Sequence, residues 1–351
     1  MLNVLRSLFR RAPAPEPSPP RTRGPATHVV ILDGTMSSLS DGCETHAGRL
    51  YKLLLEAGAR ENLTVYYEQG IQWTNWRGTV GVMKGRGINR QIKRAYGALA
   101  SRYRPGDEIV LAGYSRGAYA VRSLAGVIDM VGLIRPDQAT ERNVQLAYRH
   151  YRRGGKGPAA AAFRRKMCHS EVEIAAVAVW DTVKALGLRL PVIWRWSKED
   201  HTFHNHALGA SVRNGFHALA VDETRVAYAP VMWACPPDWA GHMEQVWFPG
   251  THGDVGGQLE GYEPARPMAN LSMVWMLQRL SACGLPLPDG AIARFETDPH
   301  APSTGKWRGW AKLFLTRRAR PVGVCRSERV HDSVSIRRAG QPTGAGQATR
   351  A

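Results

Sequence analysis

The 351-residue sequence lacks any apolar run that approaches the ~20 residues of a membrane-spanning helix. Cysteine is scarce: there are five, an odd number, widely spaced and without a C-x-x-C pair. This pattern argues against a disulfide framework or a zinc site and fits a reducing compartment. The sequence also lacks zinc-finger spacing and recognisable RNA-binding motifs, so we expect no nucleic-acid partner.

Acidic residues are few relative to basic ones, 29 against 47, which gives a net charge of +18. This balance predicts an anionic partner such as a membrane surface or an acidic substrate. Residues 1–11 are basic and amphipathic but too interrupted for a signal peptide. They form either a frayed tail or a segment that lies on a membrane. Residues 306–320 mix cations with Trp, Leu and Phe, which fits either an amphipathic helix on the core or a patch that contacts anionic lipid.

The chain divides into three parts by composition. Six prolines between residues 12 and 26 predict a disordered linker. A hydrophobic content of 44% is ample for a buried core. We therefore expect a linker over residues 1–27, a folded domain over 28–336 and a disordered tail over 337–351.

The most informative stretch is a G-x-S-x-G motif, Gly113-Tyr-Ser115-Arg-Gly117. A short apolar run precedes it and apolar residues at helical spacing follow it, which predicts a strand, a sharp turn and a helix. In such a turn Ser115 is an exposed nucleophile, Gly113 and Gly117 relieve backbone crowding, and the Arg116 amide is an oxyanion donor. A chance match in a glycine-rich chain is the alternative, but the strand and helix context favours the nucleophile.

Further elements are predicted from apolar patterns. Strands are expected at His28–Leu32, Leu63–Glu68, Glu173–Trp180 and Glu244–Phe248, and helices at about 88–103, 211–227 and 268–283. Residues 131–170 resemble a helical cap or lid, and residues 190–206 an insertion. Strands alternating with helices predict a mostly parallel, doubly wound α/β sheet with helical lid insertions.

Polar side chains follow three of the expected strands: Asp33, Asp181 and the pair His252 and Asp254. Ligands bind at the carboxyl ends of strands in open α/β sheets, so these residues and Ser115 are expected to form one site. Asp33 and Asp254 lack the fuller oxygen set of a cation site. The spacing of three nearby histidines matches no usual zinc pattern (His201, His204 and His206). We expect neither a metal nor a cofactor.

Several motifs in colinear order resemble one family. They are Leu32-Asp-Gly-Thr35, Gly113-Tyr-Ser-Arg-Gly-Ala118, Val179-Trp-Asp-Thr-Val183, Phe216-His-Ala-Leu-Ala-Val-Asp-Glu223, Gln245-Val-Trp-Phe-Pro-Gly250, His252-Gly-Asp-Val-Gly-Gly257 and Val330-His-Asp-Ser-Val334. Together they resemble the DUF2235 α/β-hydrolase domain, which includes the Tle1 phospholipase effectors of type VI secretion. The resemblance implies an α/β-hydrolase fold, a Ser-Asp-His triad and hydrolysis of lipid esters.

The triad is assigned from chain order, which in this fold is serine, acid, histidine. His331 lies late and resembles the closing histidine motif, so it is the favoured general base, with His252 as a rival or as a residue supporting Asp254. Asp254 is the favoured acid and Asp181 the alternative. Gly34 and Thr35 are candidates for the second oxyanion amide, and Asp33 lies beside them in sequence.

The sequence therefore predicts a serine hydrolase of carboxylic esters, with phospholipid acyl esters as the favoured substrate. Two alternatives stay open: a soluble esterase or thioesterase for small substrates, and a non-catalytic module of the same fold that binds lipid or a partner. The location is expected to be cytoplasmic, peripheral at an anionic membrane, or outside the cell after export by a type VI route. No oligomeric state is assigned.

Overall fold

The computed structural model describes residues 24–57, 62–70, 86–183, 207–305 and 316–340. The N-terminal segment, the 190–206 insertion and most of the 306–320 segment lie outside the described residues. No helix in the described ranges is long and apolar enough to cross a membrane.

The centre of the molecule is a seven-stranded sheet in the order β2-β1-β3-β4-β5-β6-β7. Every neighbouring pair is parallel. The strands are β1 Thr27–Leu32, β2 Leu63–Glu68, β3 Glu108–Tyr114, β4 Ala176–Trp180, β5 Asn214–Ala220, β6 His242–Phe248 and β7 Glu328–Val330. Leu32 pairs with Gly113, and Tyr114 pairs with Trp180. The segments that follow β1, β3 and β4 therefore all begin at the carboxyl end of the sheet, close to one another.

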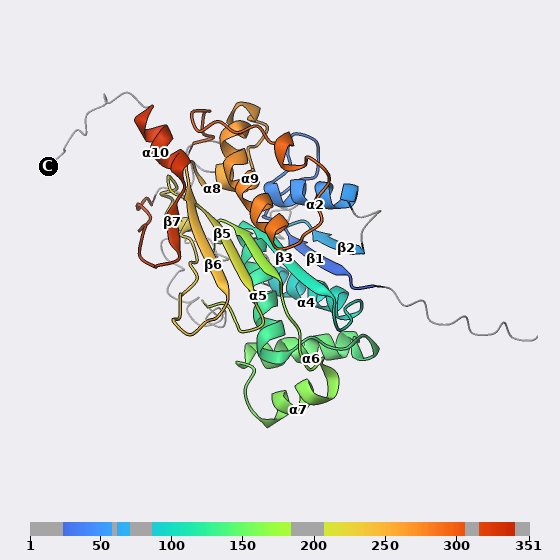
Figure 1. Cartoon of the computed structure of the whole chain (residues 1–351). Helices are drawn as coiled ribbons and strands as arrows, with labels where there is room; N and C mark the ends of the chain where they lie inside the picture. The colour runs from blue at the N-terminus through green and yellow to red at the C-terminus, as the bar shows by residue number, and fades with distance from the viewer. Residues whose placement is uncertain (1–23, 58–61, 71–85, 184–206, 306–315, 341–351) are drawn as a thin grey trace, which may run out of the picture.

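Helices cover both faces of the sheet (Figure 1). They are α2 His46–Ala57, α4 Arg86–Ala100, α5 Ser115–Val131, α6 Glu141–Arg152, α7 Pro158–Met167, α8 His252–Gly256, α9 Arg266–Ala282 and α10 Asp332–Ala339. Side chains of α4 and α5 share one buried cluster, and those of α2 and α9 share another. The chain winds outward in both directions from between β1 and β3, which is the switch point where sites form in doubly wound sheets.

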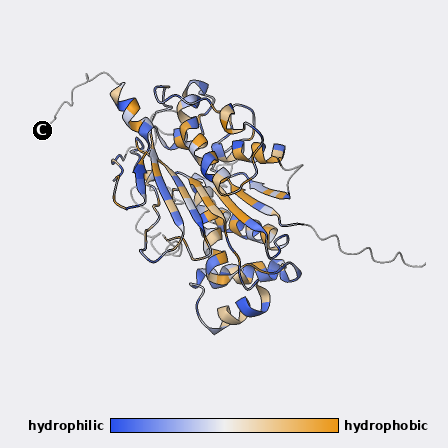
Figure 2. Cartoon of the chain, in the orientation of Figure 1, coloured by the Kyte–Doolittle hydropathy of each residue, from blue (hydrophilic) through white to orange (hydrophobic). Residues whose placement is uncertain are grey.

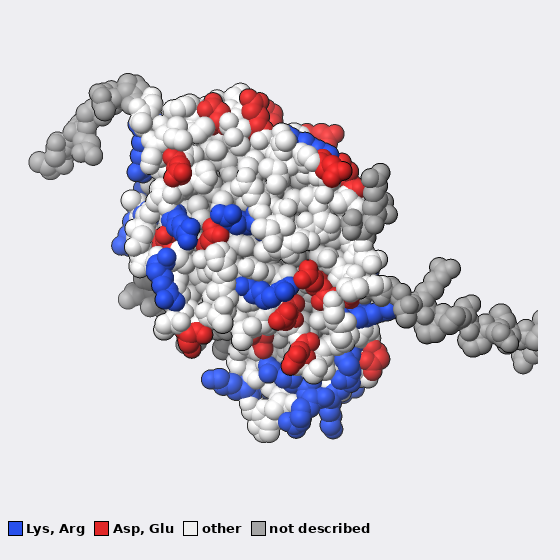
Figure 3. All heavy atoms as spheres, viewed as in Figure 1, with Lys and Arg blue, Asp and Glu red and all other residues white. Residues whose placement is uncertain are grey.

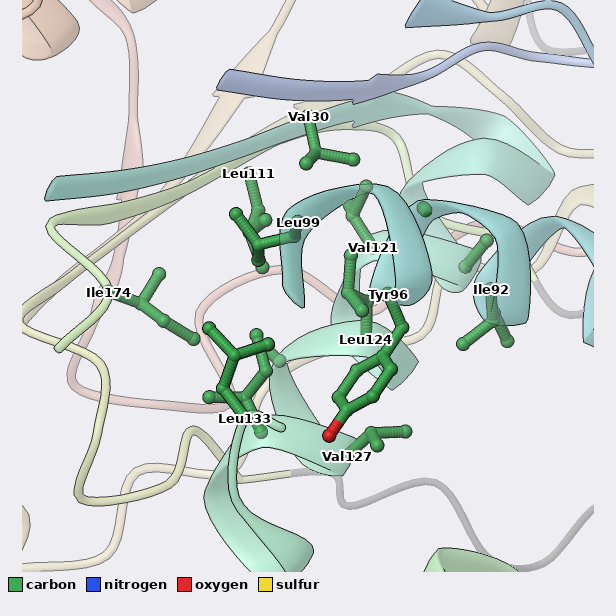
Figure 4. Close-up of a cluster of buried hydrophobic side chains, with 14 of the residues drawn as sticks. Val30, Ile92, Tyr96, Leu99, Leu111, Val121, Leu124, Val127, Leu133 and Ile174 are labelled. Carbon is green, nitrogen blue, oxygen red and sulfur yellow. The ribbon is translucent and has the colours of Figure 1, made fainter. Parts of the chain in front are cut away.

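The two buried clusters follow from the sequence pattern of the strands. Each inner strand is almost continuously buried, as a parallel sheet covered on both faces requires. Figure 2 shows hydrophobic residues concentrated in these strands. Figure 4 shows one cluster at close range, where Leu99 and Tyr96 of α4 meet Leu124 of α5 beneath Val30 and Leu111. This packing holds α5 against the sheet.

The predicted fold class is confirmed, because the sheet is parallel and doubly wound. The helix expected over residues 211–227 is wrong, since β5 Asn214–Ala220 occupies that stretch. Residues 215–220 are buried between β4 and β6 on either side. A short apolar run does not distinguish a buried strand from a buried helix, and here pairing with two strands decided the outcome. The helix α10 continues to Ala339, three residues into the expected tail.

One disulfide joins Cys235 to Cys325 across 90 residues of sequence. The cysteine spacing argued against a disulfide framework; the structure has this one bond, and the other three cysteines are free. Cys235 precedes β6 and Cys325 precedes β7, and these two strands are paired in the sheet. The wide spacing of the two cysteines in the sequence gave no sign of this bond, because the bond depends on which strands are neighbours in the sheet.

Candidate active site

The strand β3 ends at Tyr114 and α5 begins at Ser115, so Ser115 lies on the turn between them. Its φ is +57°, in the left-handed region that is costly for a residue with a side chain. Asp181, the first residue after β4, has a φ of +39°. Strained backbone at two candidate residues on neighbouring strands points to a functional site.

The two glycines of the motif allow a close approach of the first strand. A Cβ on Gly117 would lie 2.0 Å from the Leu32 carbonyl oxygen, and one on Gly113 would lie 2.8 Å from the same atom. Such distances exclude a side chain at either position unless the backbone moves. The spacing of the motif therefore reflects how closely the end of β1 packs against the turn that carries Ser115.

His252 joins Ser115 to Asp181. Its Nε2 lies 2.9 Å from Ser115 Oγ, and its Nδ1 lies 2.5 Å from Asp181 Oδ2. An ionised carboxylate only accepts hydrogen bonds, so Nδ1 carries the proton and Nε2 accepts from the serine hydroxyl. The imidazole contacts the rings of Tyr114 and Tyr228, with centroid distances of 4.9 Å and 4.7 Å. These contacts fix the plane of the histidine.

Ser115, His252 and Asp181 are called the array below. Its electrostatics favour a neutral histidine and a charged aspartate. Burial lowers the pKa of His252, and the hydrogen bond to Asp181 opposes that effect only in part. Burial alone would raise the pKa of Asp181, but the guanidinium of Arg320 and the hydrogen bond from His252 hold it well below its usual value. Asp181 is thus held ionised and His252 unprotonated, the states that a triad needs before reaction.

His331, the histidine favoured from the sequence, occupies a different place. It precedes α10, its Nδ1 lies 2.8 Å from Ser333 Oγ, and its ring stacks on Phe248 at 4.7 Å. It follows β7 at the edge of the sheet, whereas β6, which leads to His252, lies one strand nearer to Ser115. The expectation that His331 faces Ser115 is therefore corrected: His252 does.

Asp254 is also placed differently from the expectation. Its carboxylate accepts hydrogen bonds from the Thr251 amide and hydroxyl, the Ser303 hydroxyl, and the Thr304 amide and hydroxyl, all within 2.6–2.8 Å. These contacts cap the short helix α8 and join it to residues 303–304. The acid that contacts a histidine beside Ser115 is Asp181, the alternative drawn from the sequence.

Two of the three candidate oxyanion amides, those of Arg116 and Thr35, remain candidates. Arg116 is the second residue of α5, where backbone amides have no partner within the helix. The Gly34 amide instead donates to Asp33 Oδ1 at 2.6 Å, which corrects its assignment as an oxyanion donor. The neighbouring Thr35 keeps its candidacy. A Cβ on Gly34 would lie 3.4 Å from the Cβ of Ser115, so this loop passes close to the serine.

Asp33 is hydrogen-bonded to the loop formed by residues 34–35. It is almost fully buried and accepts hydrogen bonds from the hydroxyls of Thr45 and Tyr67 as well as from the Gly34 amide. Burial raises its pKa to about 6, against the lowering effect of these donors. Asp33 therefore supports the 34–35 loop and does not contact Ser115 or His252 through any described hydrogen bond.

Sequence reasoning missed two residues that contact the array. Glu223 Oε2 accepts from the His252 amide at 3.2 Å and pairs with Arg225, which lies over the ring of Tyr228. Arg320 pairs with both carboxylate oxygens of Asp181. Glu223 was part of a recognised motif but had no assigned role. Arg320 lies in a basic stretch with no local pattern that distinguishes it from its neighbours.

A small polar cavity adjoins the array. Its lining residues include Tyr114, Arg225, Tyr228, His252 and Gln258. Within the described ranges, no group of three or more His, Cys, Asp or Glu side chains is placed to hold a metal ion. The cavity borders the His252 side chain.

Comparison with known proteins gives several matches. An uncharacterized protein of Saccharomyces cerevisiae is 29% identical over 153 residues, which is 37% of this chain and 22% of that protein. An uncharacterized protein from Pseudomonas aeruginosa of known structure has a TM-score of 0.41 at 14% identity, covering 82% of this chain and 51% of that one. The structure of a Tle1 effector bound to the VgrG spike of the type 6 secretion system has a TM-score of 0.34 at 16% identity, with coverages of 67% and 51%.

This chain spans about half of each of those two structures and about a fifth of the yeast protein. The family model for the catalytic domain of Tle1-like type VI secretion phospholipase effectors matches residues 27–279, which is most of the chain. That range contains Ser115, Asp181 and His252. The chain therefore belongs to the Tle1-like phospholipase effector family, through its catalytic domain.

Proposed function

We propose that this protein is a serine hydrolase that cleaves carboxylic esters through Ser115, His252 and Asp181. The observation that carries the proposal is the continuous contact from Ser115 Oγ through the His252 imidazole to Asp181. A hydroxyl becomes an effective nucleophile when a base accepts its proton and a third group orients the base. The sharp turn at Ser115 holds its hydroxyl against His252 Nε2, and the Arg116 amide in the first turn of α5 is the proposed oxyanion donor.

The reaction follows from these positions. Ser115 Oγ attacks the ester carbonyl carbon while its proton passes to His252 Nε2. The oxyanion forms beside the Arg116 amide, with Thr35 as the candidate for the second donor. The C–O bond of the ester then breaks, and the leaving alcohol takes the proton from His252. Water attacks the acyl-enzyme with His252 again as base, which releases the acid and restores Ser115. No step requires a cofactor.

Phospholipid acyl esters are the proposed substrate. Membership of a phospholipase effector family favours this choice over a small soluble ester. Charge supports it as well, because exposed basic side chains gather on α6, α7 and the turn between them (Figure 3). These side chains are Arg142, Arg149, Arg152, Arg153, Lys156, Arg164, Arg165 and Lys166. Such a surface attracts anionic lipid, so we propose peripheral membrane contact, with delivery by a type VI route as the family suggests.

The test compares vesicles of phosphatidylglycerol and phosphatidylethanolamine with a soluble short-chain ester, using wild type and Ser115→Ala. We expect release of fatty acid from the vesicles and a loss on the order of 10³-fold or more in the variant. Cleavage of the soluble ester alone would support a small-substrate esterase and reject the phospholipase. If neither substrate is cleaved, or if Ser115→Ala matches wild type, the hydrolase proposal fails and a non-catalytic binding module becomes the better explanation.

A further inference from the structure

Asp181 has a second partner besides His252, the guanidinium of Arg320. Arg320 Nη1 lies 2.6 Å from Asp181 Oδ1, and Nη2 lies 2.9 Å from Oδ2. The same nitrogens donate to the carbonyl oxygens of Ala220, at 2.8 Å, and Tyr228, at 2.5 Å. The carboxylate is fully buried and Arg320 is 9% exposed. A paired, two-point contact of this kind fixes the orientation of a carboxylate more firmly than one hydrogen bond does.

The segment that carries Arg320 is held in place independently of this ion pair. Thr316 O accepts from the Val226 amide, and the Arg318 amide donates to Thr224 O. Five residues after Arg320, the disulfide joins Cys325 to Cys235. Arg320 also lies beyond residue 279, where the match to the family model ends. A part of the chain outside the matched catalytic domain thus reaches the centre of the site.

We propose that Arg320 is a positioning residue for the site: its guanidinium fixes the orientation of the Asp181 carboxylate and offsets part of the negative charge that His252 faces. This inference rests on the proposed hydrolase function. Without Arg320, Asp181 could rotate away from His252 Nδ1, because the remaining described partner of its side chain is the Ala220 amide, which donates to Oδ1. Arg320 itself contacts neither Ser115 nor His252 through any described hydrogen bond.

Other charged and titratable groups surround the imidazole, and they set the expected direction of change. Glu223 and Arg225 approach from the segment after β5, and Tyr114 and Tyr228 contact the ring. His217 of β5 accepts from the Thr182 amide, and burial together with the charge of Arg122 on α5 lowers its pKa to about 3, so it stays neutral. Arg320 is therefore the cation paired with the carboxylate that His252 contacts. Its removal should raise the pKa of His252, because the imidazolium then faces a less compensated Asp181.

Three variants test the proposal: Arg320→Gln, Arg320→Lys and, as a matched control, Arg318→Gln. Arg318 lies two residues away on the same segment, and its side chain is exposed. The pKa of His252 is measured by NMR on protein with ¹⁵N-labelled histidine, with the signal assigned by its absence in His252→Gln. Ester hydrolysis is measured over the same pH range.

For Arg320→Gln we expect the pKa of His252 to rise by about one unit and kcat to fall about 10- to 100-fold, with KM little changed. Arg320→Lys keeps the charge but cannot contact both oxygens, so kcat should fall while the pKa stays near that of wild type. Arg318→Gln should match wild type in both measurements.

Two outcomes would overturn the proposal. If Arg320→Gln lowers only the melting temperature, while the pKa of His252 and the kcat of the folded enzyme match wild type, the ion pair is purely structural. If Arg320→Gln does not fold, Arg320→Lys decides, and a wild-type kcat for that variant rejects a positioning role. Failure of the hydrolase proposal is seen separately: Ser115→Ala would then leave activity unchanged, whereas the NMR titration still reports whether Arg320 affects His252.

Discussion

His252 and Asp254 are two residues apart at the start of α8, yet their side chains enter different networks. His252 contacts Ser115 and Asp181, whereas Asp254 contacts Thr251, Ser303 and Thr304. The first network carries the proposed chemistry and the second holds α8 in place. This separation makes the two residues distinguishable by experiment.

His252→Gln should abolish hydrolysis, with a loss of kcat on the order of 10⁴-fold or more, because no other described group accepts the Ser115 proton. His331→Gln is the matched control. It removes a residue that precedes α10 and stacks on Phe248, so we expect kcat within about twofold of wild type and a small loss of stability. A large loss of kcat in His331→Gln with retained activity in His252→Gln would reverse the assignment.

Asp181→Asn should affect kcat, whereas Asp254→Asn should affect stability. Asp181→Asn should lower kcat about 10⁴-fold, since an amide favours the wrong tautomer of His252. Asp254→Asn should leave the kcat of the folded enzyme near wild type but reduce the free energy of unfolding by about 2 to 3 kcal/mol, because an amide cannot accept all of its present donors. Urea unfolding and initial rates measured on the same samples separate the two effects. A loss of kcat without loss of stability in Asp254→Asn would contradict this division.

The pH dependence of kcat/KM should follow the protonation of His252. Burial lowers its pKa below the usual value of 6.5, and only the neutral imidazole can accept the serine proton. Activity should therefore persist at pH 6.5 and fall as the pH drops through a lower pKa. Rates on a soluble ester between about pH 4 and 8 give the midpoint. A midpoint well above 6.5 would show that His252 is not held neutral in this way.

Asp33 should make the protein less stable as the pH rises from about 4 to 6. Its pKa is about 6 in the folded state against 3.8 for an unperturbed carboxyl, so the folded state binds the proton more tightly. The contribution is fully present below the unfolded pKa and is lost as the pH rises through the folded pKa; its size is on the order of 3 kcal/mol. Urea unfolding across this range, compared with Asp33→Asn, checks it. Equal slopes in the two proteins would contradict a raised pKa.

The disulfide between Cys235 and Cys325 should stabilise the folded state by about 2 to 4 kcal/mol, because it closes a long loop in the unfolded chain. Cys325→Ser should lower the midpoint of urea unfolding to the value that wild type shows in a reducing buffer. Cys43→Ser is the control, since Cys43 is exposed and free. Insensitivity of wild type to reductant would show that the bond does not contribute.

The sequence was most informative where the signal is local. The turn at Ser115 depends on residues 109–128, which lie together in the chain, and both the strand and the helix were found there. The choice between His252 and His331 depends on the order of strands in the sheet, which no local pattern contains. Chain order alone favoured the later histidine, but β7 lies at the edge of the sheet and places His331 away from Ser115. Arg320 was missed for the same reason, since its partner lies 139 positions earlier.

The segment after residue 315 contributes to both the sheet and the candidate site. It supplies β7, the second cysteine of the disulfide and the guanidinium beside Asp181. A fragment that stopped at residue 279 would keep the serine, histidine and aspartate but would uncover the backbone of β6 and leave a buried carboxylate uncompensated. Open strand edges promote self-association, and an unpaired buried charge weakens folding. The match to the family model covers residues 27–279. The smallest part of this chain that we expect to fold and act alone is therefore longer than the part that the family model matches.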